Sequence, residues 1–396
     1  MPFWLVFVAA LAWGLQFAFL MPALALLLVE IYGATDAQVG TVLMVFNTAA
    51  LVASTVIPVL ADRKRNYVAP LVIAAVLTLA LVGSLAATSS LWVATAALVS
   101  FGAPAGIGFV MLFALMRHSG ETNDRIMQAR ATVSFAWVGG PPLATFVMDR
   151  FGPRAAFILI AIVAVVNLVT ALAMRAHART AAAAALAGDP GTTADTAQGD
   201  PAGGRPVPWG LVVTVMIVFA LLQATNNAGV SVMTLYVTET LREPLLWAGI
   251  VLGVAALVEI PGLLALGKLE GRFTYRRIML AGCVAGIAYY AVMALAGGIW
   301  PAILAQVLNA SFYACVAGLG LTLFQSMIDR PGLATALFSN AGRVGAILSG
   351  ALIVAGTSTP FGYAGVYLLS AIITALAVPV VAASFGRVPA PAPPRV

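Results

Sequence analysis

The sequence predicts an all-α membrane protein with twelve transmembrane helices in two pseudo-symmetric six-helix bundles. Three observations support this fold class. Of the 396 residues, 62% are hydrophobic and 9% are charged, and the mean hydropathy is +1.03. Soluble domains usually carry about 25% charged residues, so the surplus apolar surface must face lipid. The chain also holds twelve apolar runs near the roughly 20 residues that cross a bilayer, and its halves share features at a nearly constant offset.

The apolar runs are separated by turns rich in charged residues, Gly and Pro, such as Asp62–Asn66 and Asp149–Arg154. The first run lacks a basic leader and continues to about Val29, which is too long for a signal peptide, so we expect a retained helix. We expect the helices at 3–29, 39–60, 67–87, 91–115, 128–148 and 154–176, and then at 209–238, 246–266, 277–297, 301–327, 333–356 and 363–385.

The chain divides into four predicted regions. Residues 1–177 form the first bundle and residues 208–388 form the second. Residues 178–207 contain Ala, Gly, Asp, Thr and Pro with almost no large apolar side chain, which is typical of a flexible cytoplasmic linker. Residues 389–396 are rich in Pro and Ala and are predicted to be a disordered tail.

Basic residues predict the orientation of the helices. With the N-terminus inside, fifteen of the twenty Lys and Arg residues fall in inner loops and the tail, and three fall in outer loops. This bias predicts that both termini lie in the cytoplasm of a multi-pass inner (plasma) membrane protein. The net charge of +6 and the pI of 9.6 therefore reflect topology, and we expect no nucleic-acid partner.

Four pairs of positions indicate an internal duplication. Gln16 corresponds to Gln223 at an offset of 207, and Gly40 corresponds to Gly249 at an offset of 209. The turn at Asp62 corresponds to that at Glu270, offset by 208, and Gly140 in the fifth helix to its counterpart in the eleventh, offset by 205. Six-helix repeats of this kind are common in transporters, where the substrate site lies near the membrane midplane between repeats.

Two charged residues are predicted to lie inside the membrane. Glu259 is the only carboxylate that we place deep in a span. A low-dielectric environment favours the neutral form of a carboxyl group, so Glu259 is a candidate for proton coupling, with a structural hydrogen bond as the alternative. Arg343 has three readings: an ion pair with Glu259, a contact with substrate hydroxyls or a carboxylate, or a side chain extended to the cytoplasmic interface.

Amides and aromatic rings are the candidate substrate contacts. Amides both donate and accept hydrogen bonds, which suits hydroxylated ligands, although many membrane amides only join helices. Of nine amides noted inside the spans, two lie in the first half and seven in the second. The candidate substrate-binding residues are Gln16, Asn47, Trp137, Asn226, Asn227, Tyr236, Asn309, Gln325 and Asn340.

Asp62, Arg63 and Arg130 are candidates for a cytoplasmic gate. An acid followed by bases in a short loop can latch neighbouring helices, and topological anchoring is the alternative. The sequence holds no His-Glu-x-x-His motif and no phosphate-binding loop, and its two cysteines fit no metal spacing. We therefore expect no enzyme activity, no cofactor and no metal site.

Several of these stretches resemble the major facilitator superfamily and, within it, the sugar efflux transporter family. The turn Leu60–Arg63 is similar to the superfamily's loop after the second helix, although Pro58 stands where Gly is usual. Stretches similar to the sugar efflux family are Phe113–Arg117, Ser134–Ala144, Glu259–Pro261, Asn309–Ala310, Phe324–Gln325 and Arg330–Arg343. As a set they cover helices one to eleven without the linker.

The resemblance implies proton-coupled export of sugars or glycosides by alternating access, by a protein that we expect to be a monomer. It also implies roles for Glu259 and Arg343. Two departures make the first half more apolar: Phe109–Met111 replaces a polar stretch, and Met21 replaces a Gln before Pro22. Efflux of drugs or other lipophilic small molecules is therefore the alternative.

Overall fold

The computed structural model describes residues 2–64, 66–119, 121–187, 208–270, 273–328 and 331–387. These residues are helical with short connections, and twelve of the helical spans are long and apolar enough to cross a membrane. The predicted fold class is confirmed. The spans are Trp4–Tyr32, Asp36–Lys64, Val68–Ala87, Leu91–His118, Arg125–Phe151, Ala155–His177, Trp209–Thr240, Leu245–Leu263, Tyr275–Leu295, Ile299–Met327, Leu333–Thr357 and Tyr363–Ser384.

Some spans consist of several helical segments, so the element labels outnumber the spans. In order they are α1 (Phe3–Tyr32), α2 (Asp36–Lys64), α3 (Val68–Ala87), α4 (Leu91–Ala97), η1 (Leu98–Gly102), α5 (Ala103–Ala105), α6 (Gly108–His118), α7 (Asn123–Phe151), α8 (Ala155–Ala187), α9 (Trp209–Leu235), η2 (Tyr236–Thr240), α10 (Leu245–Glu270), α11 (Tyr275–Leu295), α12 (Ile299–Tyr313), η3 (Ala314–Gly318), α13 (Leu319–Met327), α14 (Pro331–Thr357), α15 (Tyr363–Ser384) and η4 (Phe385–Arg387).

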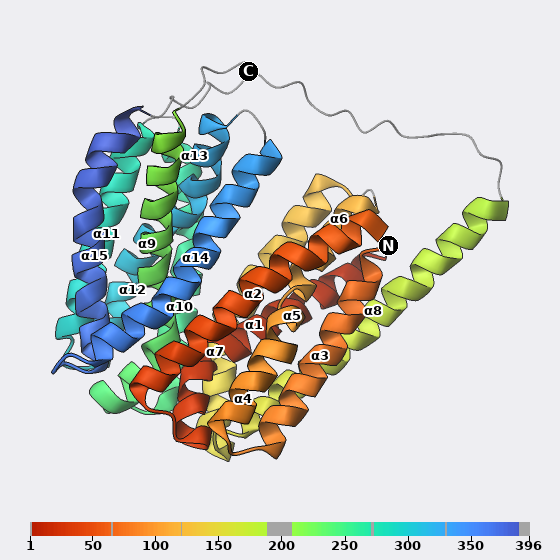
Figure 1. Cartoon of the computed structure of the whole chain (residues 1–396), viewed down its shortest axis with the longest axis horizontal. Coiled ribbons are helices and arrows are strands. Elements are labelled where there is room, and N and C mark those ends of the chain that lie inside the picture. Colours follow the sequence, from red (N-terminus) through yellow and green to blue (C-terminus); the bar gives the residue numbers. More distant parts are fainter. Residues whose placement is uncertain are drawn as a thin grey trace.

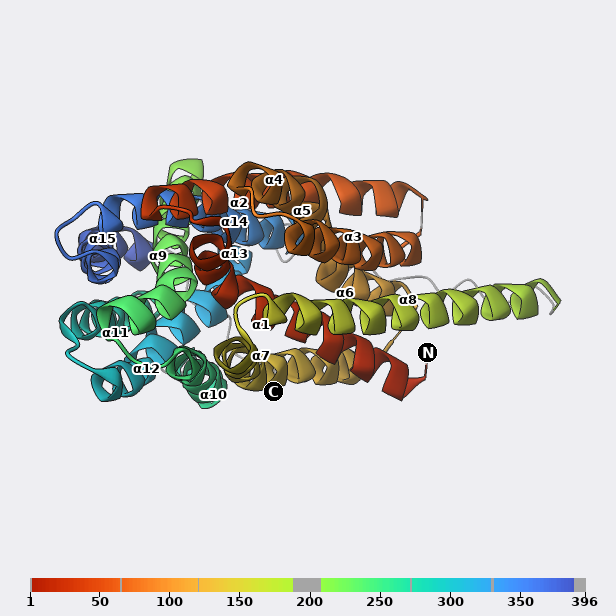
Figure 2. The same ribbon diagram turned by 90° about the horizontal axis from the view of Figure 1, so that it is seen from below.

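Elements α1 to α8 form one bundle and α9 to α15 form the other, and the two lie side by side (Figures 1 and 2). We call the face where α1 begins and α2 ends the basic face, because Arg63, Arg117 and Arg276 lie there. The face where α1 ends and α2 begins is the opposite face. Figure 1 shows that the ribbons of α2 and α14 converge toward the opposite face and diverge toward the basic face.

Large apolar side chains cover the outside of both bundles, as expected for contact with lipid. Tryptophans mark the two ends of the spans: Trp4 and Trp209 are 62% and 63% exposed at the basic face, and Trp92 and Trp300 are 80% and 66% exposed at the opposite face. Tryptophan is enriched at membrane–water interfaces because its ring is apolar and its N–H is polar. The positions of these rings are consistent with a bilayer between the two faces.

The fourth and the tenth span each contain a π-helical segment. The fourth span runs through α4, η1, α5 and α6, and the tenth runs through α12, η3 and α13. A π-helical turn adds a residue to the helix and often occurs at functional sites. These two segments lie in corresponding spans of the halves, whereas the π-helical segment η2 in the seventh span corresponds to an α-helical first span in the other half.

The predicted linker begins later than expected. Helix α8 continues to Ala187, because the alanine run that follows Arg179 has a high helix propensity. Residues 188–207, which complete the predicted linker, and residues 388–396, which hold the predicted tail, lie outside the described residues.

Candidate functional site

Hydrogen bonds join the two bundles near the opposite face. The Tyr363 hydroxyl at the start of α15 donates to Oδ1 of Asp36 at the start of α2, at 2.5 Å. The Thr234 hydroxyl of α9 donates to the backbone oxygen of Pro22 in α1, at 3.1 Å. A carbonyl oxygen has two lone pairs, so the Pro22 oxygen can accept this bond in addition to one from its own helix.

Glycines bring the bundles into backbone contact at this face. Gly40 of α2 and Gly350 of α14 touch, and a Cβ at Gly40 would lie 2.5 Å from the Gly350 carbonyl oxygen. A Cβ at Gly249 of α10 would collide with the hydroxyl of Thr145 and the backbone of Pro141 in α7. Small residues permit such close approach of transmembrane helices. The opposite face is therefore closed by α2–α14 and α7–α10 contacts.

A cavity of about 450 Å³ lies between the bundles and contains Glu259. Its volume is within the range of about 300–1,000 Å³ that small-molecule sites occupy. The first bundle supplies one wall of the cavity, which includes Trp137 of α7, and α9 to α12 of the second bundle supply the other wall. We call it the Glu259 cavity. The predicted residues that line it are Trp137, Asn226, Asn227, Glu259 and Asn309.

The amides of the Glu259 cavity are connected to one another. Nδ2 of Asn226 donates to Oδ1 of Asn309 at 3.5 Å, and Nδ2 of Asn309 donates to Oε1 of Gln306 at 3.0 Å. The Gln306 amide in turn donates to the Ala302 carbonyl oxygen at 2.9 Å. This chain orients Asn309 toward the cavity, where Tyr289 and Tyr313 add aromatic surface. Sequence inspection considered the ring of Tyr313 as a surface for a sugar but did not select Tyr289.

Glu259 lies in the middle of α10, two residues before the internal Pro261. Its side chain is partly buried and lines the cavity, and no hydrogen-bond or ion-pair partner for its carboxyl group is found among the described residues. A carboxyl group that lacks a protein partner in an apolar membrane interior is suited to exchange a proton with a ligand or water.

A second cavity, of about 220 Å³, contains Arg343 and is called the Arg343 cavity. It is lined by α1, α2 and the segment around η1 in the first bundle, together with α14 in the second. Gln16 and Asn47 of the predicted set lie here, and Nδ2 of Asn47 donates to the Ala346 carbonyl oxygen at 3.0 Å across the bundles. The two cavities share Phe17 and Met21 in their linings.

The predicted ion pair between Glu259 and Arg343 is not present. The two side chains line different cavities, and Arg343 instead donates from Nη1 to Oδ1 of Asn340 at 3.3 Å. The pair required the eighth and eleventh spans to meet, but α10 packs against α7 of the first bundle and α14 packs against α2. Arg343 points into the interior cavity, so its side chain is not extended to the lipid interface.

Sequence inspection missed a buried amide in the first half. Asn167 of α8 donates from Nδ2 to Oε1 of Gln16 at 2.9 Å, and Nε2 of Gln16 donates to the Thr78 hydroxyl at 3.1 Å. All three side chains are buried, and Oδ1 of Asn167 has no hydrogen-bond partner. An asparagine within an apolar run was the available signal. Asn167 therefore joins Gln16 and Asn47 as an amide inside the first half.

Three predicted substrate contacts line neither cavity, and one of them, Asn340, instead accepts the hydrogen bond from Arg343. Tyr236 is fully buried, and its hydroxyl donates to the Met293 carbonyl oxygen, so it packs α9 and η2 against α11. Gln325 of α13 is exposed and lines neither cavity. These predictions assumed that a polar residue in a span faces a cavity, which fails for Tyr236, because it packs within its own bundle, and for Gln325, because it is exposed.

The predicted gate residues lie at the basic face. Asp62 accepts a hydrogen bond from the Tyr67 hydroxyl at 2.7 Å, and Arg63 is exposed. The Arg130 guanidinium lies over the Phe113 ring, with its central carbon 5.8 Å from the ring centroid. These residues lie on the first bundle at the basic face, where α2 and α14 diverge (Figure 1). Their gating role remains a prediction for a different conformation, in which the basic face is closed.

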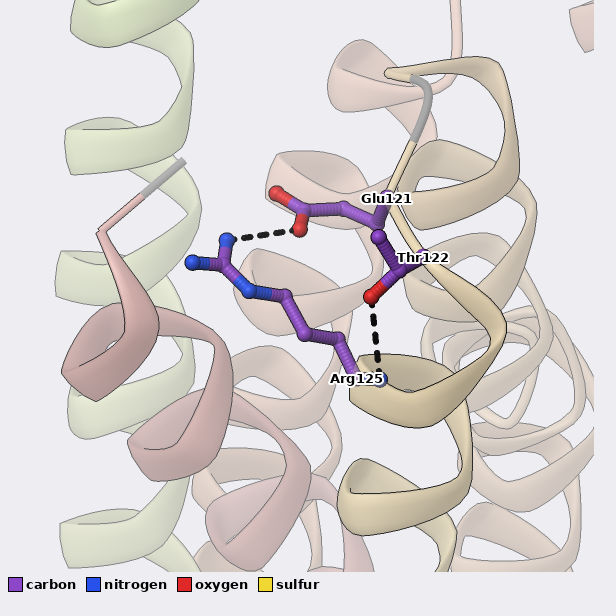
Figure 3. Close-up of polar contacts among 3 residues, drawn as sticks. All are labelled: Glu121, Thr122 and Arg125. Carbon is purple, nitrogen blue, oxygen red and sulfur yellow. Dashed lines mark hydrogen bonds and ion pairs between the residues drawn. The ribbon is translucent and has the colours of Figure 1, made fainter.

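The start of α7 is fixed by a local polar cluster (Figure 3). Nη1 of Arg125 donates to Oε2 of Glu121 at 2.8 Å, and the Thr122 hydroxyl accepts from the Arg125 backbone N–H as an N-cap. Burial alone would raise the pKa of Glu121, but the hydrogen bond and charge of Arg125 are among the interactions that hold it below its usual value. This cluster anchors the helix that carries Trp137 into the Glu259 cavity.

Comparisons with known proteins agree with this architecture. The family model described as Major Facilitator Superfamily matches residues 3–350. The chain is 32% identical to a Deinococcus radiodurans protein that is provisionally named a sugar efflux transporter, over 92% of this chain and 93% of that protein. It is also 32% identical to sugar efflux transporter A of Dickeya chrysanthemi, over 64% and 62% of the two chains. Among solved structures, the nucleoside transporter NupG superposes with a TM-score of 0.75 at 13% identity, covering 97% of this chain and 99% of that chain.

Proposed function

Because the chain belongs to the Major Facilitator Superfamily, whose members are transporters and not enzymes, we propose that it exports sugars or glycosides in exchange for protons. The observation that carries the proposal is the Glu259 cavity, where a carboxyl group with no partner among the described residues lies beside amides and aromatic rings. Two relatives of this chain are named for sugar efflux.

The lining of the cavity supports a hydroxylated ligand. Asn226, Asn227 and Asn309 offer amide donors and acceptors, which can bond to sugar hydroxyls in either direction. Trp137 and Tyr313 offer ring faces against which the apolar face of a pyranose can pack. The site is therefore suited to a neutral ring that carries several hydroxyl groups.

Glu259 is the proposed coupling residue. Substrate entering from the cytoplasm would bind when Glu259 releases its proton, and a proton from outside would reload the carboxyl group as substrate leaves. In this scheme proton and substrate compete for one cavity, so a proton gradient drives export. Arg343 lines the neighbouring cavity and takes no part in this scheme.

The proposal also assigns a direction to the conformation. The bias of Lys and Arg places the basic face and both termini in the cytoplasm of the inner (plasma) membrane. The contacts at Gly40 and Gly249 then close the outer side, and the conformation is inward-facing. Alternating access would separate those contacts and bring Asp62, Arg63 and Arg130 toward the second bundle. We expect the transporting unit to be a monomer bound to lipid.

Transport in proteoliposomes tests the proposal. Vesicles with purified protein should exchange labelled methyl β-D-glucoside for unlabelled glucoside, and an imposed pH gradient should drive accumulation. In Glu259→Gln the exchange should persist while the pH gradient adds nothing, because glutamine keeps the shape of the side chain but carries no proton. Glucoside accumulation in Glu259→Gln that responds to pH as in the wild type would refute proton coupling through this residue.

The apolar wall shared by the two cavities supports one alternative, the export of lipophilic drugs. Phe17 and Met21 line both cavities, and Leu20 and Phe46 extend the apolar surface around Arg343. A competition panel separates the two functions. Inhibition of glucoside exchange by sugars alone supports the proposal, and inhibition by neutral and cationic drugs but not by sugars supports the alternative.

A further inference from the structure

Arg343 has no role in the proposed coupling step, yet it lies inside the membrane and faces a cavity. It is the only charged residue among those that line the Arg343 cavity. The other polar side chains there are Gln16, Asn47, Ser54 and Thr78. The surrounding surface is apolar and comes from α1, α2 and the segment around η1.

The charge of Arg343 is uncompensated within the described residues. Its side chain is partly buried, and no described carboxylate lies within 4.0 Å of the guanidinium nitrogens. The one hydrogen bond that it makes within the described part of the chain, to Asn340 Oδ1 at 3.3 Å, uses one of five N–H donors. Charges removed from water are normally paired, because an isolated ion in a low dielectric is costly. The free donors of Arg343 are therefore available to an anion from outside the chain.

The remaining polar groups of the cavity are largely occupied. The Gln16 amide bonds to Thr78 and Asn167, and the Asn47 amide bonds to the Ala346 carbonyl oxygen. The Ser54 hydroxyl donates to its own helix at the Leu51 carbonyl oxygen. A polyol would need many free donors and acceptors, which this cavity lacks. A single anionic group would need only the guanidinium.

We propose that Arg343 forms an anion subsite, and that the preferred substrates are sugars or glycosides that carry a carboxylate. This inference rests on the proposed function. The sugar ring would occupy the Glu259 cavity, and the carboxylate would reach past Phe17 and Met21, which line both cavities. A carboxylate fits because a guanidinium binds it through two parallel hydrogen bonds. A doubly charged phosphate would call for a second cation, and no other lining residue is charged.

Paired ligands that differ in one group test the subsite. Methyl β-D-glucoside and methyl β-D-glucuronide have the same ring. It carries a hydroxymethyl group in the glucoside and a carboxylate in the glucuronide. Calorimetry on the purified wild-type protein should give a Kd at least about tenfold lower for the glucuronide, the scale of a charge-assisted bidentate contact. Arg343→Gln should abolish this preference while the Kd for the glucoside stays near the wild-type value.

Two further variants keep the test decisive. Arg343→Lys should keep part of the preference, because lysine retains the charge but not the planar fork. Arg154→Gln removes an equal charge at the opposite face, where the Arg154 side chain is exposed and bonds to Ser89, and should leave the preference unchanged. If Arg343→Gln does not fold, the comparison of Arg343→Lys with Arg154→Gln still tests the subsite, because only Arg343→Lys should weaken the preference for the glucuronide.

The outcomes separate this inference from the proposed function. Equal affinity of the wild type for both ligands, or a preference that survives in Arg343→Gln, overturns the anion subsite while glycoside transport stands. Tighter binding of glucose 6-phosphate than of the glucuronide overturns the choice of a carboxylate. Failure of the wild type to bind either glycoside or to exchange either in proteoliposomes overturns the proposed function as well.

Discussion

The two halves of the molecule are alike where they meet and unlike at the centre. At the opposite face each half contributes a glycine near the start of its second span, Gly40 and Gly249, and each glycine packs against a helix of the other half. At the centre, the first half ties its amides together in the Gln16–Thr78–Asn167 network. The second half directs Asn226, Asn309 and Glu259 toward a cavity.

This difference separates two uses of polar residues in a membrane. A buried amide whose groups are bonded within one bundle holds helices together and has little capacity left for a ligand. An amide that lines a cavity can exchange its bonds with a ligand during transport. The comparison therefore predicts that variants at the glycines block the conformational change, that variants in the second half alter substrate affinity, and that variants in the first-half network alter stability.

The largest effect is expected for Gly40→Val. The added side chain would collide with the Gly350 carbonyl oxygen and with Val354, so the opposite face could not close. Glucoside exchange in proteoliposomes should fall by more than about tenfold, because a transporter held open on one side cannot alternate. Gly83→Val in α3 is the matched control, since a Cβ there meets nothing within 4 Å. Normal exchange by Gly40→Val would show that the two halves need not meet at this glycine.

A smaller effect is expected for Asn309→Ala. The substitution removes the central member of the Asn226–Asn309–Gln306 chain and one amide from the cavity. The KM for glucoside exchange should rise by about tenfold, the scale of one or two lost hydrogen bonds to a ligand. Gln325→Ala is the control, because Gln325 is exposed and lines neither cavity. Equal KM values for the two variants would argue against the Glu259 cavity as the sugar site.

The smallest effect on transport is expected for Gln16→Leu. Leucine would leave Thr78 and Asn167 without their bonds to the glutamine, at a cost of about 1–3 kcal/mol for a buried unsatisfied group. Scanning fluorimetry should show a lower melting temperature than for Thr214→Val, whose exposed hydroxyl bonds only to its own helix. The KM for glucoside should stay unchanged, so a raised KM with unaltered melting would reverse the roles assigned to the halves.

Composition and apolar runs were sufficient to predict the fold, because spanning helices in lipid need long apolar segments and little else. Sequence reasoning also predicted Gly40 and Gly249 as an equivalent pair, and it selected Glu259, Trp137 and the three asparagines of the Glu259 cavity. It placed Tyr236 wrongly, because a polar residue in a span can face its own bundle as well as a ligand. It allowed an ion pair between Glu259 and Arg343 as one of three readings, because the sequence does not reveal whether the eighth and eleventh spans meet.

The π-helical segments and the path of α8 beyond Arg175 also escaped prediction. A π-helical turn depends on the packing of neighbouring helices, and η1 and η3 carry no residue pattern that distinguishes them from the α-helix on either side. Asn167 could have been found, since it is a single asparagine in an otherwise apolar run. Its partners could not, because Gln16 and Thr78 come from two other helices.

Proton release on ligand binding tests the central claim, that Glu259 exchanges its proton for substrate. Purified protein in weakly buffered detergent solution with a pH indicator dye would be mixed with saturating methyl β-D-glucoside. The wild type should release protons as the glycoside binds, Asn309→Ala should do so at a higher glycoside concentration, and Glu259→Gln should bind the glycoside without release. Wild-type binding without proton release, or equal release by Glu259→Gln, would contradict the account.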